Sequence, residues 1–373
     1  GGPLEARVVD VGEGLPADWA RVGAGASGSI ALVHTTEMKT FDDLFAEYMR
    51  AGPLMRAAAQ AQVRALLIQS TRPRGLLYQH PMVFGRTPGT LPVALVAREQ
   101  AERLAWLAAQ GETRVRMGIV NRIGPTYEAR NVVAEISGRE KPDEFVVLGA
   151  HLDSWSLGTG AEDNGVNVAL VLDVARAFHE LGIRPRRSVR FVLFTGEEQG
   201  MWGSAGYVER HQAELDRHAG AVIFDVGSGR TRGFYVSGRP ELRSVVARAL
   251  STYPGMNPSA QSLEGIDGTD NFDFLLSGIP NFVADQDPAP YLPDYHAESD
   301  VPDRVNAKEA RRNAGLAATL VWSLADSPAP IPKRQTRAEV DALLVRTKLV
   351  EQMQGFEQWD DWKAGRRGFP ASP

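Results

Sequence analysis

The sequence predicts an α/β protein in which a mixed, mostly parallel sheet is flanked by helices, with a smaller β-rich α+β module ahead of it. Three observations support this fold class. The length of 373 residues suggests about two domains at roughly 100–200 residues each. From about residue 128, apolar strand-like runs alternate with longer helix-like runs, which is typical of a parallel sheet. Residues 8–120 instead carry shorter elements, punctuated by glycine and proline.

The elements of the first module are short apolar runs bounded by turn residues. Runs of this kind predict strands, whereas apolar residues that recur every three or four positions predict helices. The predicted strands are residues 6–11, 29–34, 63–68, 92–96 and 114–119, and the predicted helices are residues 41–48, 55–62 and 98–109.

The second module contains longer elements in an alternating order. Its predicted strands are residues 131–136, 144–148, 188–195, 220–226 and 280–284, and its predicted helices are residues 166–181, 204–210 and 305–325. A tail follows, in which residues 338–363 read as an amphipathic helix and then tryptophan-rich polar turns.

Composition excludes several classes of protein. A net charge of −5 makes no electrostatic case for binding nucleic acid, and no apolar run approaches the roughly 20 residues of a membrane span. There is no cysteine, so thiolate ligands, cysteine nucleophiles and disulfides are absent. Any transition-metal site must therefore use carboxylates together with the seven histidines, His34, His80, His151, His179, His211, His218 and His296.

Common catalytic motifs are missing or misplaced. "GAGASG" at residues 23–28 has the spacing of a dinucleotide-binding loop, but it precedes a predicted strand instead of following one, which indicates a plain turn. The patterns GxSxG, GxxxxGK[ST] and HExxH do not occur, which argues against a nucleophile-elbow hydrolase, a P-loop enzyme and a helix-borne zinc protease.

Histidine and carboxylate residues instead follow the carboxyl ends of four apolar strands. The carboxyl ends of parallel strands meet at one edge of a sheet, where ligands bind. Taken singly, each residue has an ordinary interpretation: a surface histidine, a solvated turn, or for Asp163 a helix N-cap. Their recurrence at one edge favours a site for one or two zinc ions. The residues are His151, Asp153 and Asp163 in "GAHLDSWSLGTGAEDNG", then Glu197 and Glu198, Asp225, and His296.

The motifs also resemble those of a known family. "GAHLDSW", "GAEDNG", "FTGEEQGMWGS", "FDVGSG", "GTDNFDFLLSGIP" and "YHAESDVPDRV" resemble, in this order, the motifs of the co-catalytic zinc peptidases, among them bacterial leucyl aminopeptidases and the carboxypeptidase Q group. This resemblance spans about residues 128–325 and implies the zinc-exopeptidase, phosphorylase/hydrolase-like fold. Residues 12–122 look like the protease-associated domain that many such peptidases carry as an insertion. The implied divisions are a catalytic stub at 1–11, that domain, a catalytic domain at 123–328 and an extension at 329–373.

The resemblance implies two Zn²⁺ ions per chain and a role for each residue. His151 and Asp225 would bind one ion, Glu198 and His296 the other, and Asp163 would bridge both. Glu197 would be the general base, and Asp153 would hold His151 and fix its tautomer. The peptide bond after the bridging aspartate, Asp163–Asn164, is often cis in such proteins. The activity implied is that of an exopeptidase that hydrolyses dipeptides or short peptides through a metal-bridged hydroxide.

Some positions depart from the family pattern. Ser156 stands where relatives usually carry an acid, and Ala297 and Val301 stand where they often carry threonine. Glu162, beside the bridging Asp163, is expected to be exposed or to lie behind the ligands, and not to bind metal. Arg230, Arg232 and Arg239 are candidates for capturing a substrate carboxylate, and Tyr291 or Tyr295 for assisting an oxyanion, but solvated arginines and packed loop aromatics are the more ordinary interpretations.

Two other functions remain open at this point: a single-zinc enzyme similar to glutaminyl cyclases, and a non-catalytic, receptor-like binding protein of the same fold. The resemblance further implies a peptide substrate, a homodimer, and an exported protein, periplasmic or secreted. The 35 arginines against 6 lysines suggest a bacterial source. Zinc stoichiometry and peptide hydrolysis would separate these alternatives.

Overall fold

The computed structural model describes residues 3–84, 89, 91–251, 253–257, 260–330 and 332–369. The chain divides into two compact units. The small unit comprises residues 1–127 together with the short segment 296–299, and the large unit comprises residues 128–295 and 300–373. The first boundary thus falls after residue 127, whereas the sequence predicted it after residue 122. None of the helices in the described residues has the length and apolarity that a membrane crossing needs.

A five-stranded sheet forms the centre of the small unit, with the strand order β4-β3-β2-β1-β5. The first four strands are parallel, and β5 pairs antiparallel with β1. The strands are β1 Leu4–Asp10, β2 Ile30–Val33, β3 Ala65–Gln69, β4 Val93–Val96 and β5 Arg114–Met117.

The first strand differs from its predicted assignment. Residues 1–11 were expected to begin the catalytic domain, but β1 pairs on both sides within the sheet of the small unit, with β2 and with β5. Alternate side chains explain this placement, because Ala6 and Val8 are buried in the same apolar cluster as Ile30 and Leu32 of β2. An alternating apolar strand joins whichever sheet buries that face.

The α-helices among the described residues of the small unit are α1 Pro16–Val22, α2 Phe41–Gln60 and α3 Arg98–Gln110. The sequence predicted two helices, residues 41–48 and 55–62, where α2 is a single helix. Pro53 lies inside it, although proline removes a backbone donor and usually ends a helix. Here Leu44 and Leu54, on either side of the proline, are both buried, so packing of one continuous apolar face outweighs the local cost.

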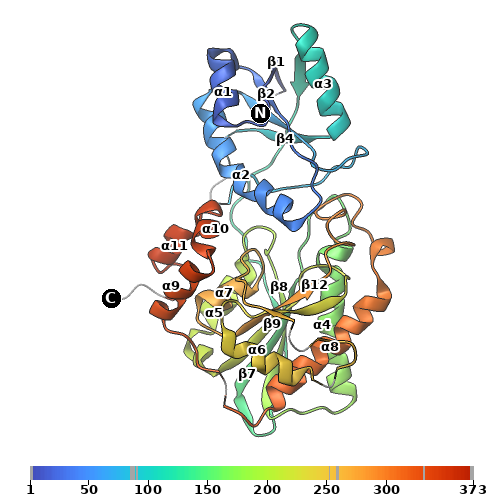
Figure 1. Ribbon diagram of the computed structural model, residues 1–373, viewed down its shortest axis with the longest axis vertical. Helices are drawn as coiled ribbons and strands as arrows, with labels where there is room; N and C mark the ends of the chain where they lie inside the picture. The colour runs from blue at the N-terminus through green and yellow to red at the C-terminus, as the bar shows by residue number, and fades with distance from the viewer. Residues whose placement is uncertain are drawn as a thin grey trace. The chain divides into compact units, whose positions relative to one another are not determined.

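The large unit contains a seven-stranded sheet with the order β11-β10-β12-β9-β7-β8-β6 (Figure 1). The four central strands β12, β9, β7 and β8 are parallel, while β6 and β10 pair antiparallel with their neighbours β8 and β12. This mixed, mostly parallel sheet confirms the predicted fold class. The strands are β6 Val132–Ile136, β7 Lys141–His151, β8 Arg187–Phe194, β9 His218–Ile223, β10 Thr231–Tyr235, β11 Gln261–Ser262 and β12 Asn281–Gln286.

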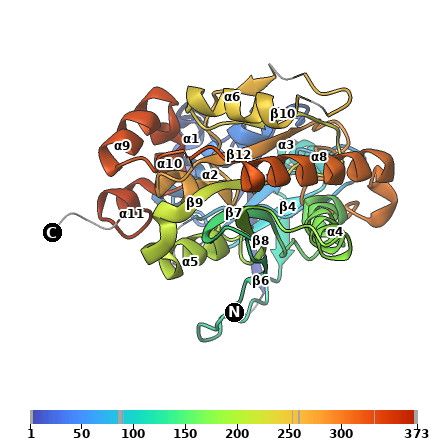
Figure 2. The same ribbon diagram turned by 90° about the horizontal axis from the view of Figure 1, so that it is seen from below.

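Helices cover both faces of this sheet. Side chains of a strand alternate between the two faces, so Val146 and Leu148 of β7 pack in a cluster with α4, α6 and α8, whereas Val147 packs with α5 and α7. Figures 1 and 2 show α4 and α8 side by side. The helices are α4 Val166–Glu180, α5 Trp202–Arg210, α6 Pro240–Ala249, α7 Asn271–Leu276 and α8 Ala307–Asp326.

The C-terminal extension forms three short helices, α9 Arg337–Arg346, α10 Leu349–Gly355 and α11 Trp359–Lys363. Its tryptophans were predicted to lie in polar turns, but Trp362 is fully buried, and the guanidinium of Arg337 lies 4.5 Å from the centre of its ring. Beyond α11, Arg367 donates to both carboxylate oxygens of Asp273 in α7, at 2.7 and 2.9 Å. The extension therefore packs as part of the large unit.

A buried histidine at the start of β9 makes the stability of the large unit sensitive to acid. Nδ1 of His218 lies 3.0 Å from the Glu214 carbonyl, and Nε2 lies 3.0 Å from the hydroxyl of Tyr207, so a neutral ring satisfies both partners. Burial lowers the pKa of His218 to about 4, below the value of an unfolded histidine. The unfolded chain therefore binds the proton first, and stability should fall as the pH drops from about 6.5 to 4.

We expect the free energy of unfolding to fall by roughly 3 kcal/mol between pH 7 and pH 4 because of His218. Each pH unit between the unfolded and the folded pKa contributes about 1.4 kcal/mol. Urea titrations of the wild type and of His218→Phe at both pH values measure this. The variant should be less stable at pH 7, having lost two hydrogen bonds, but its stability should depend less on pH. Equal losses in the two proteins would rule out His218 as the cause.

Candidate metal centre

The four central strands of the large unit end at one edge of the sheet, and the predicted site residues follow those ends. His151 is the last residue of β7 and lies opposite Phe194, the last residue of β8. Glu197 and Glu198 follow Phe194 after a two-residue turn, and Asp225 comes two residues after the end of β9. The parallel register therefore delivers side chains from distant segments to one place, as the sequence predicted.

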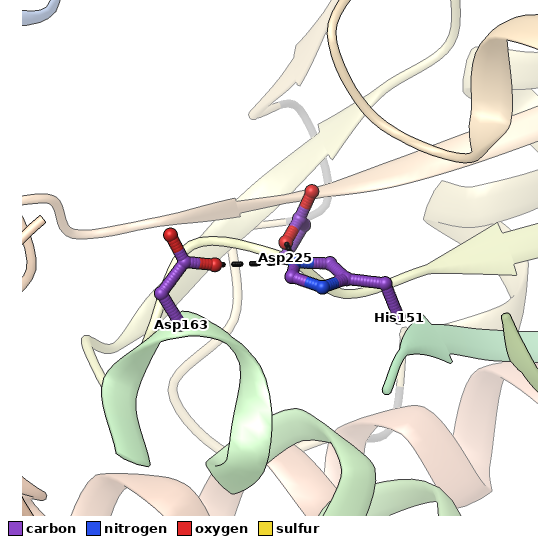
Figure 3. Close-up of side chains that lie close together, drawn as sticks. All are labelled: His151, Asp163 and Asp225. Atoms are coloured by element: carbon purple, nitrogen blue, oxygen red, sulfur yellow. Dashed lines mark ion pairs between the residues drawn. The ribbon is translucent and has the colours of Figure 1, made fainter. Parts of the chain in front are cut away.

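Three of these side chains form a compact, buried group. His151, Asp163 and Asp225 each offer a ligand atom, and the three atoms lie within 4.8 Å of one another. Nε2 of His151 is 3.1 Å from an oxygen of Asp163 and 2.8 Å from an oxygen of Asp225 (Figure 3). All three residues are buried, at 1%, 4% and 7% exposure. Two acids held this closely in a low-dielectric interior need a shared positive charge.

A tight turn places Asp163 in this group. The turn Ala161–Gly165 precedes α4, and the amide of Gly165 donates to the Gly160 carbonyl at 2.8 Å. Gly160 has φ +65°, and a side chain there would collide with Ser154, so glycine is required on both grounds. The peptide bond Asp163–Asn164 is cis, as the resemblance implied. Asp163 thus reaches the same point as His151, twelve residues earlier.

Asp153 contacts His151 through its backbone carbonyl and not through its carboxylate. Nδ1 of His151 lies 2.9 Å from the backbone carbonyl of Asp153, whereas its carboxylate is 4.0 Å away. The Nδ1–H therefore donates to the carbonyl, and Nε2 is left as the ligand atom. The Asp153 carboxylate accepts instead from the amides of Glu197, at 3.1 Å, and Glu198, at 3.3 Å. One residue thereby fixes both the histidine and the adjacent acidic loop.

Glu197 and Glu198 lie in this loop, half-buried, and differ in their neighbours. A carboxylate oxygen of Glu198 comes within 4.8 Å of one from Asp163. Burial raises the pKa of Glu197 well above its usual range; His151 opposes this effect, while Asp225 and Glu198 reinforce it. Although burial lowers the pKa of His151, the carboxylate of Asp225 and hydrogen bonds to Asp163 and Asp225 raise it well above 6.5. The charges of these residues are therefore strongly interdependent.

His296 begins the segment 296–299, which belongs to the small unit. The residues on either side of this segment, Tyr295 and Asp300, belong to the large unit. Nδ1 of His296 is 3.2 Å from the backbone carbonyl of Gln79. As in His151, a bond from Nδ1 to a carbonyl leaves Nε2 as the atom that can bind a metal.

Glu162 is neither exposed nor a member of the group of ligands. It is 1% exposed, and its carboxylate accepts from the amide of Ser228 at 2.6 Å and from the Ser228 hydroxyl at 2.5 Å. The alternative that it lies behind the ligands therefore holds. Sequence reasoning did not single out Ser228, although it belongs to the "FDVGSG" motif beside Asp225.

Asp300 is a second residue that sequence reasoning missed. Its carboxylate accepts from the backbone amides of Glu162, at 2.7 Å, and Asp163, at 3.1 Å, and so fixes the turn that carries the predicted bridging ligand. Its place in "YHAESD", four residues after His296, was the available signal. An acid that follows a motif histidine in the sequence suggests a supporting hydrogen bond, but the sequence does not show which atom donates to it.

The candidates for substrate capture stand elsewhere. Arg230 pairs with Glu309 and Arg232 with Asp287, both on the surface, while the buried Arg239 donates to backbone carbonyls, including that of Lys333. The interpretation as solvated arginines therefore fits Arg230 and Arg232, whereas Arg239 is buried and bonds to backbone carbonyls. Tyr291 is buried beside the group: burial raises the pKa of its hydroxyl well above 10, and the carboxylate of Asp163 adds to this.

The group of His151, Asp163 and Asp225 fits zinc. One imidazole and two carboxylates are donors that zinc accepts. Tetrahedral coordination with bonds of roughly 2.0–2.1 Å implies ligand atoms roughly 3.3 Å apart. The separations of 2.8 and 3.1 Å from Nε2 to the two carboxylates lie close to this value.

Comparisons with known proteins show the family of this chain. Residues 131–321 match peptidase family M28. Carboxypeptidase Q of Xenopus laevis is 30% identical over 248 residues, which cover 65% of this chain and 52% of the relative. The chain thus spans about half the length of the curated relatives it matches.

Two solved structures share the fold. A peptidase M28 precursor from Shewanella amazonensis aligns with a TM-score of 0.75 and 26% identity, covering 90% of this chain and 76% of the other. BSAP, a zinc aminopeptidase from Bacillus subtilis, aligns with a TM-score of 0.66 and 22% identity, covering 90% and 79%. The predicted resemblance to the co-catalytic zinc peptidases is confirmed, and the chain belongs to peptidase family M28.

Proposed function

We propose that this protein is a zinc-dependent exopeptidase that hydrolyses dipeptides or short peptides. The observation that carries the proposal is the buried group of His151, Asp163 and Asp225, whose ligand atoms lie within 4.8 Å of one another at the carboxyl edge of the sheet. The family, and the activities named for carboxypeptidase Q and the Bacillus aminopeptidase, support it.

We propose two ions per chain. His151 and Asp225 would hold one, Glu198 and His296 the other, and Asp163 would bridge them. The proximity of Glu198 to Asp163 supports this arrangement, as does the Nδ1 bond of each histidine to a carbonyl. Zinc bound here would polarise the scissile carbonyl and lower the pKa of a nearby water molecule.

Glu197 would act as the general base. It would take a proton from the attacking water and pass it to the leaving amine as the carbon–nitrogen bond breaks. The Asp153 carboxylate, bonded to the Glu197 amide, would keep the base in position. No residue needs to form a covalent intermediate.

Residues 12–122, within the small unit, would form a protease-associated domain, as the sequence resemblance implies. We also propose that the protein works outside the cytoplasm, in the periplasm or the medium, and as a homodimer. The carboxypeptidase Q resemblance supports both statements.

Metal removal tests the function directly. After dialysis against a strong chelator, we expect hydrolysis of dipeptides and short peptides to be lost, and to return when Zn²⁺ is added. Atomic absorption should find two zinc ions in each active chain. One ion per chain with cyclisation of N-terminal glutamine would instead identify a glutaminyl-cyclase-like enzyme. A folded protein that binds no zinc and cleaves no peptide would identify a receptor-like binding protein.

A further inference from the structure

The two residues that flank Asp163 both bond to the segment that carries Asp225. On one side, Glu162 accepts from the amide of Ser228 at 2.6 Å and from its hydroxyl at 2.5 Å. On the other side, the amide group of Asn164 donates to the Phe224 carbonyl at 3.0 Å and to the Asp225 carboxylate at 2.9 Å. The segments carrying Asp163 and Asp225 are thus joined on both sides of the ligand group.

The bonds of Glu162 extend further into the large unit. The Ser228 hydroxyl also accepts from the amide of Asn306 at 2.8 Å, just before α8 begins. Gly227 has φ +65°, and a side chain there would collide with the Glu162 carboxylate, so this glycine leaves room for the pair. A buried carboxylate is costly unless hydrogen bonds compensate it, and here both bonds come from Ser228.

We propose that Glu162 is a positioning residue of the metal centre, and that with Ser228 it holds the carboxylates of Asp163 and Asp225 at the separation that one cation requires. This inference rests on the proposed function, because it takes the group to be a metal site. Two like charges in an apolar interior repel each other. A loop held only by its ends would let them move apart, whereas a loop clamped beside each ligand keeps them in place before the metal arrives.

A purely structural role for Glu162 makes a different prediction. In that case, losing the bond would lower the stability of the fold and leave metal affinity unchanged. A matched control exists in Ser237, which is as fully buried as Ser228 and whose hydroxyl donates to the Asn281 side chain at 2.6 Å. Ser237→Ala removes a buried hydroxyl away from the ligand group, together with its bond to Asn281. Ser228→Ala removes a buried hydroxyl beside the ligand group, together with its bonds to Glu162 and to the Asn306 amide.

The experiment measures the affinity of the metal-free full chain for Zn²⁺ by competition with a chromophoric chelator, alongside the melting temperature of each variant. We expect Glu162→Gln to weaken Zn²⁺ binding by roughly 10- to 100-fold, the usual effect of removing a supporting group behind a ligand. The glutamine side chain has only one accepting oxygen, so its NH₂ group would face one of the two groups of Ser228 that donate to Glu162. Ser228→Ala should also weaken Zn²⁺ binding, but by a smaller factor, because the backbone amide of residue 228 still donates to Glu162. Ser237→Ala should bind Zn²⁺ like the wild type.

The proposal is overturned if Glu162→Gln and Ser228→Ala both bind Zn²⁺ within twofold of the wild type while Asp225→Asn loses it. If Glu162→Gln does not fold, the Zn²⁺ affinity of Ser228→Ala is compared with that of Ser237→Ala, provided that the two variants have similar melting temperatures. Equal affinities would then overturn the proposal. If Asp225→Asn also binds Zn²⁺ like the wild type, the group is not a metal site, and the proposed function fails together with the inference. The Asp225 variant therefore separates the two failures.

Discussion

Glu197→Ala is expected to lower kcat for peptide hydrolysis by at least about 100-fold while the protein keeps its zinc. A positioned general base typically contributes 10²- to 10⁴-fold, and alanine has no group to replace it. Glu197 belongs to neither group of proposed metal ligands, so the ligands remain when it is removed. The Asp153 carboxylate bonds to the amide of residue 197, which alanine retains, so the loop should hold its shape.

Steady-state kinetics and metal analysis on the same preparation check this result. Glu209→Ala is the matched control, since Glu209 is an exposed glutamate of α5, and it should hydrolyse peptides like the wild type. Glu197→Gln should be as inactive as the alanine variant, because its amide cannot accept the proton. Turnover near the wild-type rate in either Glu197 variant would remove the residue from its proposed role, and loss of zinc would reassign it as a ligand.

Asp163→Asn is expected to have a larger effect, with loss of bound zinc and a fall in activity on the order of 1000-fold or more, since both ions would lose their shared ligand. The Asp163 carboxylate approaches His151 at 3.1 Å and lies within 4.8 Å of the Glu198 carboxylate. Asparagine keeps the shape of the side chain and removes its charge. The metal-free variant should melt no lower than the metal-free wild type, because one of several crowded acids has been neutralised.

Zinc content, activity and melting temperature measure this prediction. Asp173→Asn provides the control: Asp173 is exposed on α4, ten residues further along the chain, and pairs with Arg176 at 2.7 Å. It should retain zinc and full activity. An Asp163→Asn protein that holds two zinc ions and turns over normally would exclude a bridging role and require another residue to join the ions.

The order of elements in the large unit was predictable because it depends on local sequence. The runs that became β7, β8, β9 and β12 are apolar and short, and each is followed by an acid or leads to a histidine. Parallel pairing then brings their ends together whatever the intervening loops do. Elements with weaker local patterns were missed, among them β10, a five-residue strand with Arg232 and Gly233 near its start, and α7, which is only six residues long and fully buried.

Errors arose where packing of distant segments outweighs local pattern. Residues 1–11 were expected to begin the catalytic domain, but β1 pairs within the sheet of the small unit, because an alternating strand fits any sheet that buries one of its faces. Trp362 was expected at a polar turn, but the extension folds back over α7 and buries it. Two helices were predicted where α2 is a single one, which the burial of Leu44 and Leu54 on either side of Pro53 keeps continuous. In each case the deciding contact lies far away in the chain.

The sequence by itself determined which side chains could bind metal and near which strand ends they would lie, because residue type and strand order are properties of the chain. Only the tertiary structure decided which atoms act and what holds them. It showed that Asp153 reaches His151 through a carbonyl and the acidic loop through its carboxylate, and that Glu162 is buried against Ser228. A hydrogen bond depends on differences of about one ångström between segments far apart in the chain, and motif spacing does not specify positions so finely.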